Sequence, residues 1–508
     1  MTVEHEKPAG GLSRRGFLGS AALGAAGIAL AGRAPAQPQG GGSSGGSGGS
    51  GGGTSQGTRV RRNIYALAQT PEGQATIEAY RRGVKAMMDK PLSDVTSWRF
   101  QAAIHLPNPA DAVDLNALPV ELQLYLDPRN LCQHGRPAFL PWHRMYVYFF
   151  ERILRKAADK PDFALPYWNY SDSAAERILP AAFRDPPSEA ANPLFRTARR
   201  QVHNDGDPLP ASVVSHSIAM REATAGPAGA RPGFYTIVEL QPHNVIHTTI
   251  GGAGLMSDPA TAALDPIFWL HHCNIDRLWT RWIAQGRTNP TDATFLARVH
   301  RFWDEDGNLV EMTTREVMDT VSRLDYRYDD ETAPEAGTVV LAQVRTGVEA
   351  GPMTSELAAS AAPVVLTREG VSVAAQPVVE AGGPELFATT TVEQLDQPVM
   401  LRLDDIRFNT PPRTVFEVYL NPPPEGVADQ DPTYFVGLFA PFSPPEAGES
   451  YSETFYVSGL INRQIEAGIY EGGAISVEIR PMPMPEEDSG VEAGPLPEVT
   501  VGRVSLIR

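Results

Sequence analysis

Two pairs of histidines have the residue type and the spacing to bind a metal ion. In "QPHNVIH", His243 and His247 are four residues apart, so they point the same way on a helix that begins at Pro242. In "FWLHHCNIDRLW", His271 and His272 stand side by side within an apolar run. A buried imidazole costs free energy unless its ring nitrogens have partners, so a metal or a tight hydrogen-bond network is expected there. One member of the second pair would bring the number of imidazoles around His243 and His247 to three.

A second group of histidines lies earlier in the chain. His105 occurs in "IHLPN", and His134 and His143 occur in "LCQHGRPAFLPWHR". His143 lies on an apolar helix face, where a lone histidine is more often a core residue than a ligand. The chain thus offers two sets of three imidazoles. It has no Cys₄ set, which disfavours structural zinc, and no H-E-x-x-H motif, which disfavours a zinc peptidase. It has no pair of Glu-x-x-His motifs, which disfavours a carboxylate-bridged di-iron site. Ligation by nitrogen alone suits copper best, which indicates two copper ions.

The histidines indicate which part of the chain carries the chemistry. At 508 residues the chain is too long for one ordinary domain, and none of its eleven histidines lies after His300. Residues 59–335 show helical periodicity, with helices expected around Pro141, after Pro242 and from His272. We therefore predict a mainly α-helical catalytic domain over residues 59–335.

The remainder of the chain changes character. Residues 336–394 are rich in Ala, Val, Gly and Pro, and we expect a linker with possible strands. From residue 395 to 508, short β-branched and aromatic runs such as "TVFEVYLN", "YFVGLF" and "AISVEIRP" alternate with Pro and Gly clusters. This pattern predicts a C-terminal all-β sandwich or barrel.

The N-terminal residues have the features of an export signal. Arg14 and Arg15 precede a short, mildly apolar run that ends in an Ala-Pro-Ala cleavage pattern, which predicts a twin-arginine signal peptide over residues 1–36. The run is too short and too weakly apolar for a membrane-spanning helix. A Gly/Ser-rich linker follows at residues 37–58. We expect an exported protein, periplasmic or secreted.

The composition also disfavours some classes of partner and a disulfide framework. The formal net charge of −17 argues against nucleic acid or an anionic membrane as a partner, because both require clustered Lys and Arg. The two cysteines, Cys132 and Cys273, cannot build a disulfide framework, so any role they have is local.

Several stretches resemble one known family. "SWRFQAAIH", "FLPWHRMYVYFFERIL", "DFALPYWNY", "PHNVIH", "DPIFWLHHCNIDRLW" and "FWDEDGNLVEM" are similar to plant-type members of the type-3 copper proteins, the tyrosinases and polyphenol (catechol) oxidases. The resemblance covers residues 59–330 and extends to the tail around "FEVYLN" and "YFVGLF". It implies a four-helix bundle around a dinuclear copper site. The ligands that it implies are, for one copper, His105, His134 and His143, and for the other, His243, His247 and His272.

The resemblance also implies an activity. Enzymes of this family use dioxygen to oxidise o-diphenols to o-quinones, and tyrosinases also hydroxylate monophenols, so dioxygen and small phenols are the expected partners. Glu239 and Asn244 match a glutamate and an asparagine thought to hold a water that accepts the phenol proton. Glu239 could instead be a carboxylate stabilised by a helix dipole. Pro259 or Ala260 stands where plant enzymes carry a bulky Phe gate, which implies a more open pocket.

Four further expectations follow from the resemblance. Cys132 and His134 have the C-x-H spacing that forms a thioether in fungal and molluscan members, the alternative being a buried free thiol. Asp276 lies one turn after His272 and matches a family aspartate that orients an imidazole or an Arg. His271 is expected to pack or hydrogen-bond near the site without binding copper. The β-rich tail resembles the domain that covers the copper pocket of plant enzymes and keeps them latent.

Two other functions remain open. Haemocyanin-like oxygen-binding proteins carry a similar copper pair and a β-rich cover, although an exported chain with one set of six histidines and no repeats favours an enzyme. Relatives that oxidise o-aminophenols differ in pocket shape, which the sequence does not reveal.

Overall fold

The computed structural model describes residues 58–126, 131–226, 232–252, 254–331, 356–378, 399–443, 449–482 and 496–508. The predicted signal peptide and residues 37–57 of the predicted linker lie outside these ranges. No helix within them is both long enough and apolar enough to cross a membrane.

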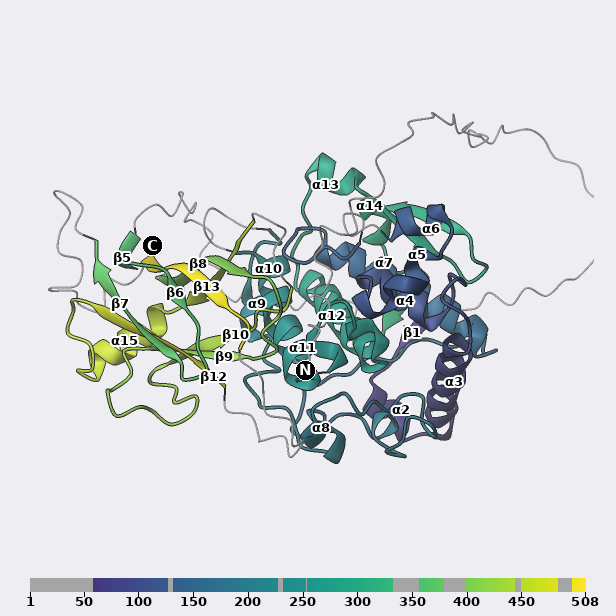
Figure 1. Ribbon diagram of the computed structural model, residues 1–508, viewed down its shortest axis with the longest axis horizontal. Helices are drawn as coiled ribbons and strands as arrows, with labels where there is room; N and C mark the ends of the chain where they lie inside the picture. The colour runs from purple at the N-terminus through teal and green to yellow at the C-terminus, as the bar shows by residue number, and fades with distance from the viewer. Residues whose placement is uncertain are drawn as a thin grey trace, which may run out of the picture. The chain divides into compact units, whose positions relative to one another are not determined.

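The residues from 58 to 331 form a mainly helical part (Figure 1). Its α-helices are α2 (Ile64–Ala68), α3 (Pro71–Met88), α4 (Trp98–His105), α5 (Ala112–Asn116), α6 (Val120–Tyr125), α7 (Phe139–Ala157), α8 (Gln201–Asp205), α9 (Ser217–Arg221), α10 (Phe234–Val238), α11 (Val245–Gly251), α12 (Ile267–Ala284), α13 (Ala293–Ala297) and α14 (Thr314–Val317). Short 3₁₀ helices are η1 (Pro109–Asp111), η3 (Ala181–Phe183), η5 (Leu255–Ser257) and η6 (Ala262–Leu264), and η4 (Glu239–Asn244) is a π-helical segment. Its strands are β1 (Arg59–Arg61), β2 (Val299–Trp303), β3 (Leu309–Thr313) and β4 (Tyr326–Tyr328).

Helices α7 and α12 form the centre of this part and pack against each other. Helix α12 begins at Ile267, five residues before the predicted start at His272, because the apolar run that precedes the histidines is itself helical and buried. In α7, buried side chains occur on all faces of the helix from Phe139 to Leu154. A helix that is buried all round belongs to a core, so both helices carry their histidines into the interior.

The chain breaks its helical path just before His243. Proline has no backbone N–H to donate, and Gln241, which precedes Pro242, has φ −146° and ψ 123°, outside the helical region. The helical path therefore restarts after Gln241, and α11 continues from Val245. His243 and His247 lie one turn apart on this restarted path, as their spacing predicts.

The N-terminal strand is fastened without a disulfide. Both cysteines are free thiols, and β1 pairs in parallel with β4. Arg61 is fully buried, donates from Nε to Glu151 at 2.8 Å and lies 3.7 Å from the ring centroid of Tyr326. A buried guanidinium with a carboxylate and an aromatic face as partners satisfies its charge, which holds β1 on the helical part.

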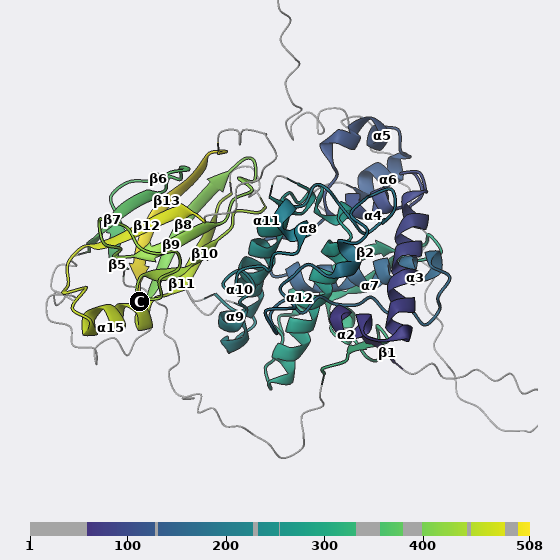
Figure 2. The ribbon, with the colours of Figure 1, turned by 90° about the horizontal axis from the view of Figure 1, so that it is seen from below.

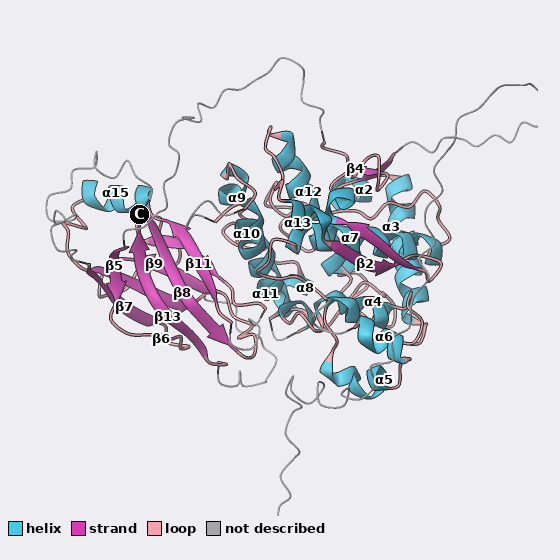
Figure 3. Cartoon of the chain, turned by 90° about the horizontal axis from the view of Figure 1, so that it is seen from above, coloured by secondary structure: helices cyan, strands magenta, loops and turns pink. Residues whose placement is uncertain are grey.

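The described residues after 355 form one antiparallel sheet of nine strands (Figure 3). The strands are β5 (Glu356–Ser360), β6 (Val364–Val365), β7 (Val371–Pro377), β8 (Met400–Phe408), β9 (Phe416–Leu420), β10 (Phe435–Phe439), β11 (Tyr451–Tyr456), β12 (Ile475–Pro481) and β13 (Val499–Ile507). Their order is β10-β9-β12-β7-β5-β13-β8-β11, with β6 paired to β13. The two end strands approach closely, since a Cβ on Gly437 of β10 would lie 3.0 Å from the Phe455 ring of β11. The sheet is thus a nearly closed barrel, which confirms the predicted all-β fold.

The interior of the barrel is apolar, and helix α15 (Ser458–Glu466) adds Leu460 and Ile461 to it (Figure 2). The predicted start of the β-rich domain at residue 395 comes too late, because β5, β6 and β7 precede it and pair with later strands. These strands read "ELAAS", "VV" and "VSVAAQP", and alanine has a low preference for strands. Pairing with β12 and β13 overrides that weak local signal.

Candidate metal centre

The first three predicted ligands come together although they lie on separate elements. His105 ends α4, His134 lies in the loop before α7, and His143 lies in the second turn of α7. These three histidines and Cys132 form a group in which one ligand atom of each residue lies within 4.8 Å of those of the others. His105 and His143 are buried, and His134 is half-buried.

The second group is formed by His243, His247, His271 and His272, whose ligand atoms also lie within 4.8 Å of one another. All four are buried. Nε2 of His247 lies 3.3 Å from Nε2 of His272. Two neutral imidazole nitrogens this close either share a proton or direct their lone pairs at the same cation.

The two groups share one buried space. The rings of His143 and His272 stack with 4.5 Å between centroids, and the rings of His134 and His243 lie 5.5 Å apart. The site therefore brings together imidazoles from four helical segments, α4, α7, η4–α11 and α12, together with His134 from the loop before α7.

Oxygen acceptors orient four of the six predicted ligands. Within the described chain, a ring Nδ1 lies 2.7–2.9 Å from an oxygen in each case; the pairs are His105 with Pro259 O, His143 with Phe139 O, His243 with Asn244 Oδ1 and His247 with Met256 O. Because these oxygens only accept, Nδ1 carries the proton and Nε2 keeps its lone pair. Nε2 of His105 and of His243 is buried and has no partner among the described residues. Such nitrogens fit a metal ion that binds through Nε2.

Burial keeps these imidazoles neutral. It lowers the pKa of His105 to about 4 and that of His243 to about 3. It lowers the pKa of the other five histidines of the two groups well below the usual value; these are His134, His143, His247, His271 and His272. Neutral imidazole is the form that binds metals, so the electrostatics favour ligation over a positive charge.

His271 differs from His272 in its surroundings. Its Nδ1 lies 3.2 Å from the hydroxyl oxygen of Tyr170, and its ring stacks on that of His243 with 5.3 Å between centroids. The sequence analysis did not identify Tyr170 as its partner. The Tyr170 contact occupies Nδ1 of His271, whereas its Nε2 is buried without a partner in the described chain.

Cys132 lies against both neighbouring imidazoles. Its Sγ is 3.5 Å from Nδ1 and 3.6 Å from Nε2 of His134, and 3.1 Å from Nε2 of His143. The carbon Cε1 lies between the two nitrogens of His134, so near-equal distances suit a sulfur that faces that carbon. Cys273 is buried, and burial raises the pKa of its thiol, so it packs as a small apolar residue.

Glu239 and Asn244 flank His243 on η4. Glu239 is buried and accepts a hydrogen bond from the backbone N–H of Gly135 at 2.6 Å, which ties η4 to the loop of His134. Burial raises the pKa of Glu239 to about 8, although the Gly135 N–H opposes the shift. Asn244 uses its amide oxygen to accept from His243.

The predicted gate region has a backbone role. The carbonyl of Pro259 accepts from His105, and Ala260 is buried beside it.

Asp276 is buried as well, so it is not an acidic residue on the exposed face of α12. Its carboxylate accepts from Arg144 at 2.5 Å and from the hydroxyls of Tyr326 and Tyr328 at 2.6 Å each. Asp276 therefore orients arginine and tyrosine side chains, and the Tyr-x-Tyr pattern is the signal that could have found its partners.

Phe442, which follows β10, also belongs to the site. Its ring lies 4.4 Å from that of His247 with 23° between the planes, and 5.4 Å and 5.9 Å from those of His134 and His243. It is 1% exposed. The sequence analysis named no residue of the tail that enters the copper pocket, and the only local signal is a Phe between prolines in "APFSPP".

Comparisons with known proteins agree on one family. The profile described as the common central domain of tyrosinase matches residues 95–227 and 212–285, and that of the polyphenol oxidase middle domain matches residues 289–337. A tyrosinase of Hahella sp. (strain CCB-MM4) is 32% identical over 489 residues, which cover 88% of this chain and 99% of that protein. The latent form of a chloroplastic polyphenol oxidase of Prunus armeniaca is 26% identical and covers 79% of this chain and 70% of its own length.

Solved structures share the fold. Latent apple tyrosinase superposes with a TM-score of 0.57 at 23% identity, covering 89% of this chain and 98% of that chain. A recombinant latent aurone synthase gives a TM-score of 0.58 at 21% identity, with 89% of both chains covered. The arrangement of a helical part followed by a β-rich part thus occurs in both.

Proposed function

The chain belongs to the tyrosinase and polyphenol oxidase family of type-3 copper proteins, and from this we propose that it uses dioxygen to oxidise o-diphenols to o-quinones. At the level of the family it is a copper-dependent oxidoreductase that acts on phenols. The observation that carries the finer proposal is the pair of imidazole groups that share one buried space.

We assign one copper ion to His105, His134 and His143, and the other to His243, His247 and His272. Four of these imidazoles have Nδ1 fixed by an oxygen, so their Nε2 atoms are available for the metal. Bound copper supplies the redox chemistry that couples oxidation of the phenol to reduction of dioxygen to water. His271 is placed outside the set because the family motif matches His272, the second of the two adjacent histidines. A held Nδ1 and an unpartnered Nε2 are features that His271 shares with the proposed ligands.

The Phe442 ring supports a site for the substrate ring. A phenol that stacked on His247 would take the position that Phe442 holds, with its hydroxyl directed at the centre. Aromatic rings favour such stacked contacts, and the apolar surroundings keep water away. The residues of the gate region, Pro259 and Ala260, add no bulky side chain over this position.

We propose that Glu239 and Asn244 support hydroxylation of monophenols. That reaction requires a phenol proton to leave near the copper ions, and a carboxyl whose pKa lies near neutrality suits a proton acceptor. Glu239 is held by the Gly135 N–H beside His134, and Asn244 is held by His243, so both are fixed between the two groups. A water held by the two residues would accept the proton.

The thioether between Cys132 and His134 is a further proposal. A bond from Sγ to Cε1 would tether the His134 ring, which is only half-buried and whose nitrogens contact Cys132 and no oxygen acceptor among the described residues. Because loops are more mobile than helices and His134 lies in a loop, such a bond would restrict the motion of its ring.

We propose that the β-rich tail keeps the enzyme latent. Phe442 occupies the position expected for substrate, and Val415, Leu438 and Met482 of the tail join the same apolar core cluster as the helical part. A chain that ends at Glu335 retains Asp330, which pairs with Arg277, and the two tyrosines that bind Asp276. We expect this shortened chain to hold copper and to oxidise catechol faster than the full chain; an equal or lower rate would contradict the proposal.

Export through the twin-arginine pathway stays a proposal that rests on Arg14 and Arg15. Replacement of both by lysine should keep the protein inside the cell, whereas unchanged export would contradict it.

The substrate proposal is tested by oxygen uptake. The copper-loaded enzyme is given tyrosine in one assay and its 3-hydroxylated form in another. We expect uptake with both, and faster uptake with the diphenol. Uptake with neither substrate, in a protein shown to hold two copper ions and with the tail removed, would contradict the proposal.

A further inference from the structure

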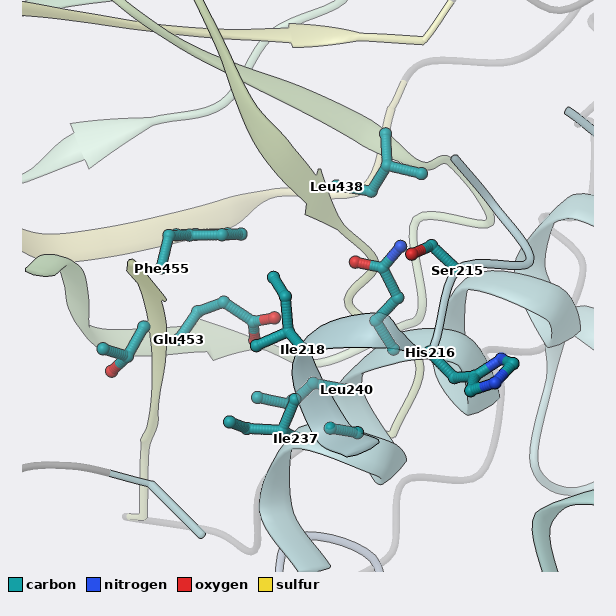
Figure 4. Close-up of a pocket in the computed structure, with 11 residues that line it drawn as sticks. Ser215, His216, Ile218, Ile237, Leu240, Leu438, Glu453 and Phe455 are labelled. Carbon is teal, nitrogen blue, oxygen red and sulfur yellow. The ribbon is translucent and has the colours of Figure 1, made fainter. Parts of the chain in front are cut away.

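A cavity that is separate from the histidine groups lies between the helical part and the barrel (Figure 4). Its apolar wall includes Ile218, Ile237 and Leu240 on the helical side and Leu438 and Phe455 on the strand side. Its volume is about 40 Å³. Since a water needs roughly 10–15 Å³ measured in the same way, the cavity has room for a ligand of a few non-hydrogen atoms.

One acidic side chain is directed into this cavity. Glu453 of β11 is 5% exposed, and Figure 4 shows its carboxyl group facing Ile218 and Leu240. Burial and the charge of Glu239 are the influences on its carboxyl group, and no hydrogen-bond donor or cation pairs with that group among the described residues, which is unusual for a buried polar group. Burial, together with the charge of nearby Glu239, raises the pKa of Glu453 well above its ordinary value.

The chemistry of the cavity selects its ligand. Glu453 is the acidic residue of its wall, Glu239 lies near Glu453, and negative charge on these groups disfavours an anion. A buried carboxyl group without a partner gains most from a cationic donor, which forms a charge-assisted hydrogen bond. The apolar wall favours a short alkyl group on that donor. A primary ammonium ion with about two to four carbons meets these three conditions.

We propose that this cavity binds a small primary alkylammonium ion, with Glu453 as its counter-ion. The ammonium group donates to the Glu453 carboxylate, and the alkyl group contacts Leu240 and Leu438. Because the wall comes from both the helical part and the barrel, the bound ion stabilises the contact between them. Only this last consequence bears on the proposed latency of the tail; the binding itself is independent of the oxidase activity.

Binding is coupled to a proton. Below its raised pKa the Glu453 carboxyl is protonated, and on binding of the ammonium ion its proton passes to the buffer, so that the carboxylate pairs with the cation. Affinity should therefore rise with pH. The other titratable groups near Glu453 are Glu239 of η4, Tyr451 of the same strand and His216 at the start of α9. Burial keeps Tyr451 protonated and His216 neutral at about pH 6 to 7.5, the range over which binding would be measured.

Calorimetry with the copper-loaded full-length protein tests the proposal, with n-propylammonium chloride as the probe and no phenol present. We expect saturable binding that is tighter at the higher pH and releases a proton, seen as a heat that depends on the buffer. n-Propanol, which has the same size but no charge, should bind at least about tenfold more weakly, because it lacks the charge-assisted bond. Equal binding of the alcohol would overturn the proposal.

Variants show where the ion binds. Glu453→Gln should weaken binding at least about tenfold, whereas Glu466→Gln, which changes an exposed glutamate of α15, should leave it unchanged. Ile218→Phe fills the cavity from a partly exposed position and should also abolish binding, which provides a second test if Glu453→Gln does not fold. An amine that coordinates copper would bind all three variants equally, and that outcome would overturn the proposal, as would the absence of binding to the unchanged protein.

Discussion

The ring of Phe442 lies nearly parallel to the imidazole of His247, with 4.4 Å between the ring centroids, although 195 residues separate them in the sequence. Phe442 belongs to the segment after β10, and His247 belongs to α11. The contact places an aromatic ring from the tail over one of the proposed copper ligands. A docked tail and a bound phenol would therefore compete for the same position.

Phe442→Ala in the full-length protein should raise the rate of catechol oxidation. Burial of a Phe side chain stabilises by about 1.5–3 kcal/mol, so its loss should shift the balance from covered to open by about 10- to 100-fold. Oxygen uptake at low catechol concentration measures the change. Phe408→Ala is the matched control, because Phe408 is buried inside the barrel and contacts Tyr451 instead of a histidine. Equal activation by both variants would show that general loosening of the tail, and not removal of the plug, is responsible.

His272→Ala should reduce copper from two ions per chain towards about one and abolish activity, because three imidazoles hold each ion. His271→Ala should leave the copper content nearly intact, because the proposed assignment places His272, and not His271, among the three ligands of that ion. Metal analysis of both purified variants makes the comparison. The reverse pattern would move the ligand assignment to His271.

Glu239→Gln and Asn244→Asp should slow tyrosine hydroxylation more than diphenol oxidation. Loss of a general base typically costs about 10²- to 10⁴-fold, and only the monophenol reaction is proposed to need this one. Initial rates on tyrosine and on its 3-hydroxylated form give the ratio. Glutamine keeps the Gly135 contact through its amide oxygen, so a structural loss alone should affect both substrates alike. An equal decrease on both substrates would refute the proton-handling role.

A thioether between Cys132 and His134 should make the copper-loaded chain lighter by two hydrogen atoms. The S–H and Cε1–H hydrogens leave as two protons and two electrons when the S–C bond forms, and dioxygen is the oxidant that accepts them. Intact-protein mass spectrometry measures this difference, with Cys132→Ser as the control that cannot form the bond. The same mass deficit in the serine variant, or no deficit in the unchanged protein, would rule out the link.

Much of the helical part could be predicted because its signals are local. The four-residue spacing of His243 and His247 and the apolar runs of α7 and α12 are visible in short windows of sequence. Four of the six proposed copper ligands therefore lie on helices that the sequence predicts; these are His143, His243, His247 and His272. The break at Gln241 and the earlier start of α12 are adjustments of a few residues, where propensity and tertiary packing compete.

The remainder depends on contacts that leave no local trace. Phe442 is one aromatic residue in a proline-rich segment, and nothing near it points to His247. The partnership of Tyr170 with His271 spans about a hundred residues, as the two positions show. Strands β5 to β7 consist largely of small residues and are strands because β12 and β13 pair with them. Glu453 is at a normal position in the alternating pattern of β11. Only the three-dimensional structure shows that its side chain is buried and that its carboxyl group has no partner.

The most direct test of the central claim is oxygen uptake by the copper-loaded Phe442→Ala protein with catechol, recorded together with its copper content. We expect two copper ions per chain and oxygen uptake that is lost when a chelator removes the copper and is restored when the copper is returned. A folded protein that holds two copper ions in the open form and consumes no oxygen with catechol would contradict it.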